Sequence, residues 1–460
     1  MRTIAVFDTG KTNIKLSVTD EAGGLIETLS TPNPVLDGPP YRHHDLAAVE
    51  NWLLAGLAAL ASRHEIAAIV CTAHGSGGVL VGEQGPAMPM IDYEQPIPPE
   101  IDRAYRDIMG SFRERGSALM LGAAHLARQM LWLERGWPDV FAKARHFLAI
   151  PQYWAWRLSG VAASEVTSLA AQSHLWCAAE SRPAALIRTM NWERLLPPLR
   201  PAWAKLGTIK PEIAERTGLA PATAVLCGIH DSSANFYQYQ AAGLRDVTIV
   251  STGTWIVAIS DRSGPDFDVE RAGLCCNADV KARPLPGMLT MGGREFAMVA
   301  GEDDRPTTEE SLARLIETRS MALPSFGSDD GLFPGTSRKG RLQGPLAERS
   351  DMRHSLALLY AALLTDKCLQ LVRTPTVVLD GSFVRDPLYG ALVAALNRDR
   401  HVLVNADQYG TATGAALLAS HETRQAPAPL ALRPAMPFSH PDLDDYRAQW
   451  LHAALSGEQR

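Results

Sequence analysis

Two short glycine-containing turns, far apart in the chain, have the residue types best suited to chemistry. The first reads DTGKTN at residues 8–13, and the second reads STGT at residues 251–254. Each is flanked by runs of apolar and β-branched residues, so each is predicted to join two strands as a tight hairpin. Such a turn points several backbone N–H groups to one side, and its glycine lets an anion approach closely. Both turns are therefore predicted to bind phosphate.

Only the first turn opens with an acidic residue, Asp8. A carboxylate at this point can hold Mg²⁺ through water. For Lys15, in the following strand, the sequence leaves two alternatives: its side chain contacts a phosphate, or it lies on a solvated face of the strand. An ordinary hairpin is the alternative interpretation, but two such turns, one of them with an acid, predict an enzyme that uses ATP. The residues expected to contact phosphate are Gly10, Thr12, Asn13, Thr252 and Gly253.

The segment GIHDSSAN at residues 228–235 places an aspartate, Asp231, at the start of a predicted helix at 229–242, which follows a predicted strand at 223–227. One interpretation makes Asp231 the N-cap of that helix. The other makes it a general base, because its carboxylate is held in one direction near the positive end of the helix. A base there can accept the proton of a substrate hydroxyl as that oxygen attacks a γ-phosphate. The two phosphate turns favour the catalytic interpretation.

A second group of polar residues is predicted to bind the acceptor. The loop CTAHGSG at residues 71–77 follows a predicted buried strand and so lies at the carboxyl edge of a sheet, where ligands collect. His74 is either a core histidine or, as the surrounding glycines favour, a ligand to a hydroxyl together with Gly75. Glu94, in the next polar loop, is a further candidate. Trp154 and Trp156 are interpreted as helix packing rather than as a stacking platform for a sugar.

Two segments of the second half of the chain are candidates for nucleotide contacts. Asp380, Gly381 and Ser382 follow a short predicted strand, a position suited to ribose or adenine. The small-residue helix start GTATGAA at residues 410–416 serves either close packing or approach to a nucleotide, and the sequence favours neither.

The elements that must position these residues predict an α/β chain with a β-hairpin start. A helix is expected at about 46–62, a strand at 66–72 and a helical insertion at about 98–221. We predict an N-terminal domain at 1–243, for the sugar and the first phosphate turn, and a C-terminal nucleotide-binding domain at 244–460. The tail beyond about residue 420 is rich in Pro and Ala and is predicted to pack as an irregular wrap.

Composition narrows the class of protein. The 460 residues carry a net charge of −6, so there is no overall basic signal for nucleic acid. The sequence has no apolar run long enough for a bilayer and no signal-peptide pattern, so we expect a cytoplasmic protein without a membrane partner. The six cysteines are scattered and are predicted to be reduced thiols without a zinc site. A homodimer is compatible with the sequence, which does not decide the oligomeric state.

With these motifs, the chain resembles the FGGY family of carbohydrate kinases, in the actin, Hsp70 and hexokinase ATPase superfamily. The two phosphate turns, residues 228–231 (GIHD) and residues 152–160 (QYWAWRLSG) resemble recurrent family segments. The resemblance implies two ribonuclease-H-like α/β domains with a cleft between them. It also implies a small-molecule sugar substrate, ATP and Mg²⁺. The opening through residues 30–33 (STPN) is most similar to L-fuculose kinases, with L-rhamnulose kinases next.

The leading hypothesis is an ATP- and Mg²⁺-dependent kinase of a ketose or deoxy-ketose, with Asp231 as base and Asp8 at the metal. The alternative is a non-catalytic sugar or nucleotide sensor, or an actin- or Hsp70-like ATPase that acts on a protein partner. Asp380 stands where many family members have glycine, which gives the alternative weight and leaves the nucleotide open.

Overall fold

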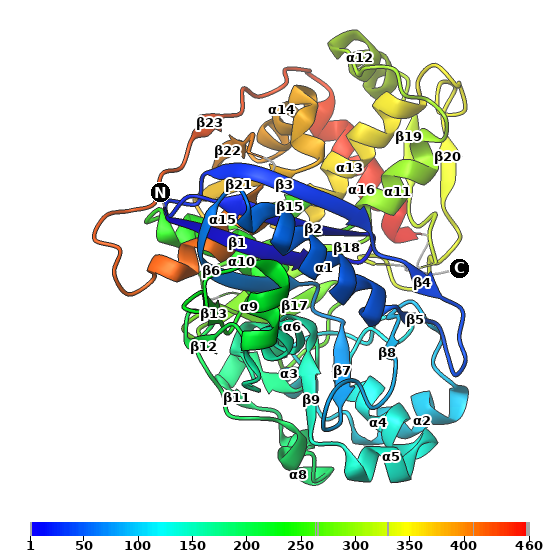
Figure 1. Ribbon diagram of the computed structural model, residues 1–460. Helices are drawn as coiled ribbons and strands as arrows, with labels where there is room; N and C mark the ends of the chain where they lie inside the picture. The colour runs from blue at the N-terminus through cyan, green and yellow to red at the C-terminus, as the bar shows by residue number, and fades with distance from the viewer. Residues whose placement is uncertain (1, 263, 265, 329–330, 408, 457–460) are drawn as a thin grey trace. The chain divides into compact units, whose positions relative to one another are not determined.

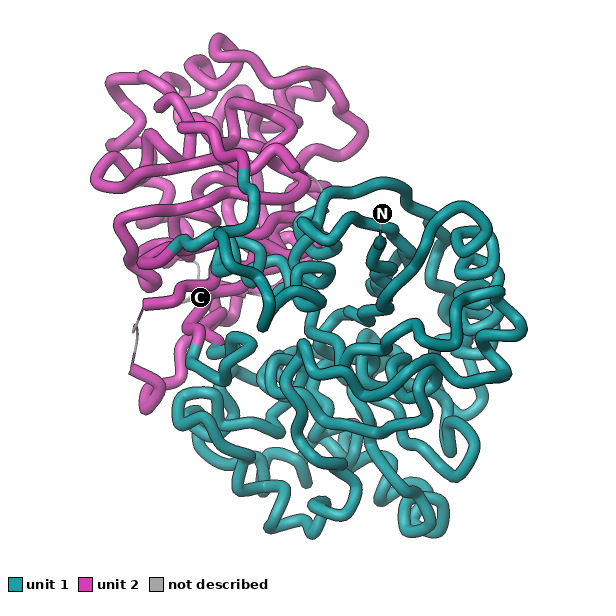
Figure 2. The backbone as a smooth tube through the Cα atoms, turned by 60° about the vertical axis from the view of Figure 1, so that its left-hand side comes forward, with its two compact units in different colours: residues 1–244, 276–284, 409–430 teal, residues 245–275, 285–408, 431–460 magenta. Residues whose placement is uncertain are grey.

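The computed structural model describes residues 2–262, 264, 266–328, 331–407 and 409–456, which form two compact units (Figure 2). Unit 1 comprises residues 1–244, 276–284 and 409–430, and unit 2 comprises residues 245–275, 285–408 and 431–460. The described residues form two seven-stranded sheets with helices packed on them, one in unit 1 and one mainly in unit 2 (Figure 1). All six cysteines are buried and form no disulfide. In the described part of the chain no helix is long and apolar enough to cross a membrane.

The sheet of unit 1 is mixed, with strand order β12-β13-β6-β1-β2-β3 and with β14 also paired to β6. The β1–β2 pair is the predicted antiparallel hairpin, whereas β6, β13 and β14 run parallel to one another and to β1. The strands are β1 (Arg2–Thr9), β2 (Asn13–Thr19), β3 (Leu25–Pro32), β6 (Glu65–Ala73), β12 (Lys205–Thr208), β13 (Ala224–Leu226) and β14 (Ile229–His230).

Alternate residues of the central strands face two different helical layers. Ala5 and Phe7 of β1 belong to a core with α1 (Leu46–Ala61), α6 (Ile150–Ser159) and α9 (Pro211–Thr217). Ile4 and Val6 belong to the core on the other face, with α10 (Asp231–Ala241) and α15 (Gly410–Ala416). Because side chains alternate along a strand, Asp8 shares the face of Ile4 and Val6. The β1 strand therefore directs Asp8 toward the layer in which α10 lies.

The remainder of unit 1 consists mainly of the predicted insertion. It is largely helical, and short strands form small sheets beside it. Its helices are α2 (Pro99–Ile108), α3 (Phe112–Arg115), α4 (Leu126–Gly136), α5 (Pro138–Lys143), α7 (Val166–Ala170) and α8 (Ala185–Thr189). The short strands β9 (His146–Ala149), β10 (Trp176–Cys177) and β11 (Arg182–Pro183) lie within the insertion. The short strands β4 (Val35–Leu36), β5 (His43–His44), β7 (Gly78–Val81) and β8 (Met90–Ile91) precede it in the chain.

The second sheet, which lies mainly in unit 2, has the order β17-β18-β16-β15-β21-β22-β23 and contains the second predicted hairpin, β15–β16. Residues 276–278 of β17 and residue 284 of β18 are counted in unit 1. Its strands are β15 (Val247–Thr252), β16 (Ile256–Ser260), β17 (Leu274–Ala278), β18 (Pro284–Thr290), β21 (Thr376–Gly381), β22 (His401–Asn405) and β23 (Leu432–Pro434), and β19 (Met321–Leu323) pairs with β20 (Arg341–Gln343). Its helices are α11 (Gly292–Ala300), α12 (Glu309–Glu317), α13 (Arg353–Leu369), α14 (Pro387–Leu396) and α16 (Leu443–Ser456). The buried α13 packs against α11 and α14.

The structure corrects two sequence-based expectations. The helix predicted from residue 229 begins at Asp231, because residues 229 and 230 form β14, and His230 is the N-cap. The tail is not an irregular wrap, since it forms β23 and the 14-residue α16. Leu443, Tyr446 and Trp450 recur at helical spacing and are buried, and the Tyr446 hydroxyl donates to the carbonyl of Ser320 at 2.8 Å. The proline-rich stretch before this helix obscured its period.

Candidate active site

Three predicted motifs of unit 1 meet because the strands that precede them are parallel. Asp8 on β1 lies opposite Thr72 on β6, and Thr72 lies opposite Ile229 on β14. The carboxyl ends of parallel strands lie at the same edge of a sheet. The turn at residues 8–13, the loop that begins at His74 and the helix that begins at Asp231 therefore leave the sheet side by side.

Asp8 has the features of a cation ligand. Its Oδ1 is buried and has no hydrogen-bond partner among the described residues, and the same holds for the hydroxyl of the adjacent Thr72. Burial, followed by the charge of Asp231, raises the pKa of Asp8 to about 7, and Lys15 across the hairpin opposes this shift. Two neighbouring carboxylates and an unpartnered oxygen fit a hard divalent cation, which prefers oxygen ligands. The donor set therefore suits Mg²⁺.

Asp231 is held through one of its two carboxylate oxygens. Its Oδ1 accepts hydrogen bonds from the backbone N–H of Ser232 at 2.5 Å and from the Ser232 hydroxyl at 3.2 Å, and it lies 3.1 Å from Nε2 of His230. Burial lowers the pKa of His230, so this imidazole is neutral, and its Nδ1 bonds the hydroxyl of Ser233 at 3.1 Å. Within the described residues Oδ2 of Asp231 has no hydrogen-bond partner. The aspartate thus presents one oriented, open oxygen.

His74 is a half-buried residue whose two ring nitrogens are buried. Both of its ring nitrogens lack a partner among the described residues. Burial, together with the nearby His44, Lys11 and His230, lowers its pKa to about 3, so the ring is neutral. It packs edge-on against Tyr93 with ring centroids 5.4 Å apart. A buried polar group without a partner is costly, and a ligand hydroxyl would satisfy it.

Lys11 connects the phosphate turn to the loop that carries Glu94. Its ammonium donates to Oδ1 of Asp92, lies 4.0 Å from Glu94 and lies 4.8 Å from the centroid of the Tyr93 ring. Arg42 lies 3.3 Å from the other oxygen of the buried Asp92. Burial acts to raise the pKa of Asp92, but Lys11 outweighs it and holds that pKa below its ordinary value. Sequence reasoning missed the Lys11–Asp92 pair, whose only signal was a cation inside the turn.

The predicted nucleotide residues of unit 2 also lie together. Thr252 on β15 donates through its hydroxyl to the carbonyl of Asp380 at 2.7 Å and accepts the N–H of Ser382 on its own carbonyl at 2.8 Å. Gly381 has φ +94°, and a Cβ there would lie 2.0 Å from the Thr252 carbonyl oxygen. A Cβ on Gly293, which sequence reasoning did not single out, would lie equally close to the Gly253 carbonyl oxygen. Both glycines permit backbone approach to the hairpin.

Residues 410–416 and Trp154 make close packing contacts. Residues 410–416 form α15 in unit 1, where a Cβ on Gly414 would lie 1.8 Å from the carbonyl oxygen of Ala234 on α10. Trp154 is buried against Phe7 with ring centroids 5.4 Å apart, in agreement with the packing interpretation.

Comparison with known proteins decides the family. Residues 3–236 match the N-terminal domain of the FGGY family of carbohydrate kinases, and residues 244–427 match the model of the carbohydrate kinase FGGY C-terminal domain. The chain belongs to the FGGY family of carbohydrate kinases. It is therefore a phosphotransferase that acts on a carbohydrate, and the predicted class of enzyme is confirmed.

Similar proteins agree with this assignment. The chain is 24% identical to L-fuculokinase of Escherichia coli K12 over 344 residues, and this alignment covers 70% of each chain. It is 25% identical to L-fuculokinase of Salmonella typhi over 272 residues, and this alignment covers 57% of each chain. A solved carbohydrate kinase from Novosphingobium aromaticivorans is 30% identical with a TM-score of 0.87 over the full length of both chains. Xylulose kinase of Lactobacillus acidophilus, at 16% identity and a TM-score of 0.80 over 99% of this chain and 97% of the other, shares the fold. The predicted two-domain α/β fold is confirmed.

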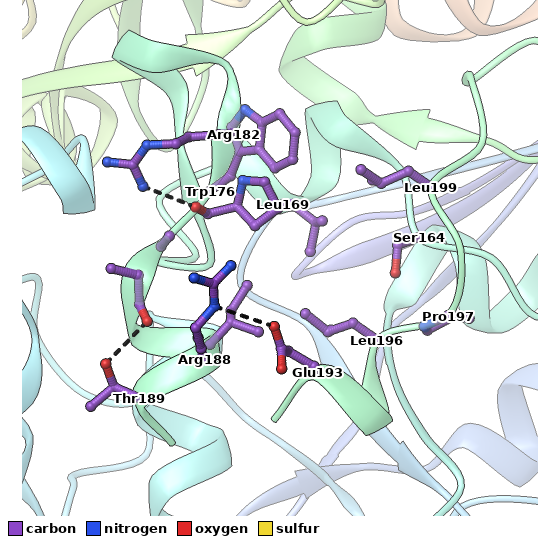
Figure 3. Close-up of a pocket in the computed structure, with 14 residues that line it drawn as sticks. Ser164, Leu169, Trp176, Arg182, Arg188, Thr189, Glu193, Leu196, Pro197 and Leu199 are labelled. Atoms are coloured by element: carbon purple, nitrogen blue, oxygen red, sulfur yellow. Dashed lines mark hydrogen bonds and ion pairs between the residues drawn. The ribbon is translucent and has the colours of Figure 1, made fainter. Parts of the chain in front are cut away.

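Outside these motifs, unit 1 of this FGGY kinase contains a cavity of about 680 Å³ (Figure 3). Leu169 of α7, Trp176 and Leu196 contribute to its lining, and none of the predicted site residues does. Beside it, Glu114, Cys177 and Glu180 have the spacing of metal ligands. Arg182 forms ion pairs with both of those carboxylates, so part of the negative charge of the cluster is already balanced.

Proposed function

We propose that this FGGY kinase transfers the γ-phosphate of ATP to a hydroxyl of an uncharged ketose or deoxy-ketose, with L-fuculose and L-rhamnulose as the leading candidates. The observation that carries the proposal is Asp231, which has one oxygen held by Ser232 and one open oxygen, and whose charge helps to raise the pKa of Asp8. The L-fuculokinase relatives support L-fuculose among these sugars.

In this mechanism Oδ2 of Asp231 accepts the proton of the sugar hydroxyl as its oxygen attacks the γ-phosphate. The neutral His230 and the N–H of Ser232 hold Oδ1 and so keep Oδ2 directed at the substrate. Asp8 holds Mg²⁺, which when bound neutralises charge on the phosphates. Gly10, Thr12 and Asn13 receive phosphate in unit 1, and Thr252, Gly253, Asp380, Gly381 and Ser382 receive the nucleotide in unit 2.

The cations of the site support an uncharged sugar. Lys11 and Arg42 both pair with the buried Asp92, so both cations already have a carboxylate partner within the protein and do not require one from a substrate. His74 is neutral and has an acceptor and a donor nitrogen to offer to hydroxyls. Together with Gly75 and Glu94 it forms the proposed contact surface for the sugar.

A panel of acceptors tests this proposal. ADP release is measured with L-fuculose, L-rhamnulose, xylulose, glycerol and gluconate at saturating ATP. We expect the highest kcat/KM with one of the first two and the lowest with gluconate, whose carboxylate would meet Asp92 and Glu94. A preference for gluconate would contradict the proposed substrate class. Binding of ATP without turnover on any sugar, or turnover without sugar, would contradict sugar phosphorylation by this site.

Replacement of His74 by Phe tests the sugar contact. Phenylalanine keeps a ring beside Tyr93 but removes both nitrogens, so we expect KM for the sugar to rise about 10- to 100-fold, as for a buried hydrogen-bonding group that loses its partner. KM for ATP should stay within about twofold. His146 of β9 is also a partly buried histidine with a lowered pKa, it lies outside the proposed site, and His146→Phe serves as control. An unchanged sugar KM in His74→Phe would remove His74 from the site.

A further inference from the structure

Glu165 is a buried carboxylate that the proposed chemistry does not use. It is fully buried, and it caps α7 by accepting the N–H groups of Thr167 and Ser168 at 3.0 Å each. Its Oε2 also accepts the hydroxyl of Thr167 at 2.6 Å and that of Ser168 at 3.3 Å. Burial raises its pKa to about 7, against the effect of these hydrogen bonds. Four donors are thus gathered around one acid inside unit 1.

Thr167 connects Glu165 to β14, the strand that directly precedes Asp231. Its hydroxyl donates to Glu165 and accepts the backbone N–H of His230 at 3.1 Å. A hydroxyl has a single proton, so donation to Glu165 leaves its lone pairs for His230. His230 ends β14, lies 3.1 Å from Oδ1 of Asp231 and precedes it directly. A continuous path of contacts therefore leads from Glu165 to Asp231.

The other end of α7 lies against the loop of His74. A Cβ on Gly75 would lie 2.5 Å from the Cβ of Ala171, which follows α7, and 3.2 Å from Nε2 of His230. Packing this tight leaves α7 little freedom to move without moving its neighbours. The short helix therefore abuts both the loop of His74 and the strand that presents Asp231.

We propose that Glu165 is a positioning residue of this kinase: through the Thr167 hydroxyl it holds the junction of β14 and α10 and so aims the Asp231 carboxylate. The inference rests on the proposed role of Asp231 as base. Loss of the Thr167 hydroxyl should let this junction shift. A displacement of a reacting group by about 1 Å can cost on the order of 100-fold in rate, while ground-state binding changes little.

Two neighbouring hydroxyls offer a matched test. Thr167→Val and Ser168→Ala each remove one hydroxyl that donates to Glu165 and leave the N–H donors, but only Thr167 contacts His230. We expect kcat to fall about 10- to 100-fold in Thr167→Val and to stay within about twofold in Ser168→Ala. KM for ATP should be unchanged in both. Thr167→Ser, which keeps the hydroxyl, should restore kcat.

Glu165→Gln supplies a second test. An amide offers one acceptor oxygen in place of two, so Glu165→Gln should lower kcat. In the double variant with Thr167→Val, the fold-loss of kcat should be smaller than the product of the two single fold-losses. Thr167→Ala replaces the valine variant if the latter does not fold. A wild-type kcat without the Thr167 hydroxyl, or an equal loss in Ser168→Ala, would overturn the positioning role. Either result beside an inactive Asp231→Asn would leave the proposed function intact.

Discussion

Replacement of Asp231 by Asn is expected to lower kcat by about 10²- to 10⁴-fold, the usual contribution of a positioned general base. Asparagine has nearly the same shape and can keep the hydrogen bonds from Ser232 on Oδ1. Its amide nitrogen cannot accept a proton from the sugar, however. Dissociation constants for sugar and ATP, measured by calorimetry, should therefore stay within about threefold.

Asp45 provides the control for this substitution. It caps α1 by accepting the N–H of Ala48 at 3.0 Å, and asparagine caps a helix about as well as aspartate. Asp45→Asn should have a wild-type kcat. If Asp231→Asn binds sugar and retains full kcat, Asp231 is not the base, and the proposed mechanism is wrong.

Replacement of Asp8 by Asn should lower kcat by about 10²- to 10³-fold, in line with the several kcal/mol that a bound metal contributes to phosphoryl transfer. The neutral amide loses the charge that, beside Asp231, favours a divalent cation. A higher Mg²⁺ concentration should therefore be needed for half-maximal rate at saturating ATP and sugar. Steady-state rates across a Mg²⁺ titration measure both effects.

Asp20 is a matched control for Asp8, since it directly follows β2, the strand that pairs with β1, and lies away from the phosphate turn. Its Oδ1 accepts the N–H groups of Ala22 and Gly24 at 2.9 and 2.8 Å in an exposed turn. Asp20→Asn should have the Mg²⁺ dependence of the wild type. The assignment of Asp8 to the metal fails if Asp8→Asn has that same dependence.

Local features of the sequence were the ones that could be predicted. Both hairpins form where glycine-containing turns separate β-branched runs. The alternation of side chains along a strand and the residue preferences of a turn both depend on a few neighbouring residues, so the sequence shows them directly. The helix at 46–62 and the strand at 66–72 also appear, as α1 and β6. Errors arose where the local signal was weak, as for the brief β14 before Asp231 and for α16 behind a proline-rich stretch.

The sequence by itself determined the family and the α/β class, and it predicts Asp8 and Asp231 as the two carboxylates of the site from contiguous motifs. Only the tertiary structure decided which groups surround them. Lys11 reaches Asp92 across 81 positions of the chain, and Thr167 reaches His230 across 63. Such contacts depend on the register of β1, β6 and β14 and on how α7 packs, and no local spacing encodes either. Tertiary packing also decided the place of residues 410–416. They lie in unit 1 against α10, although they are distant in sequence from the strands that they cover.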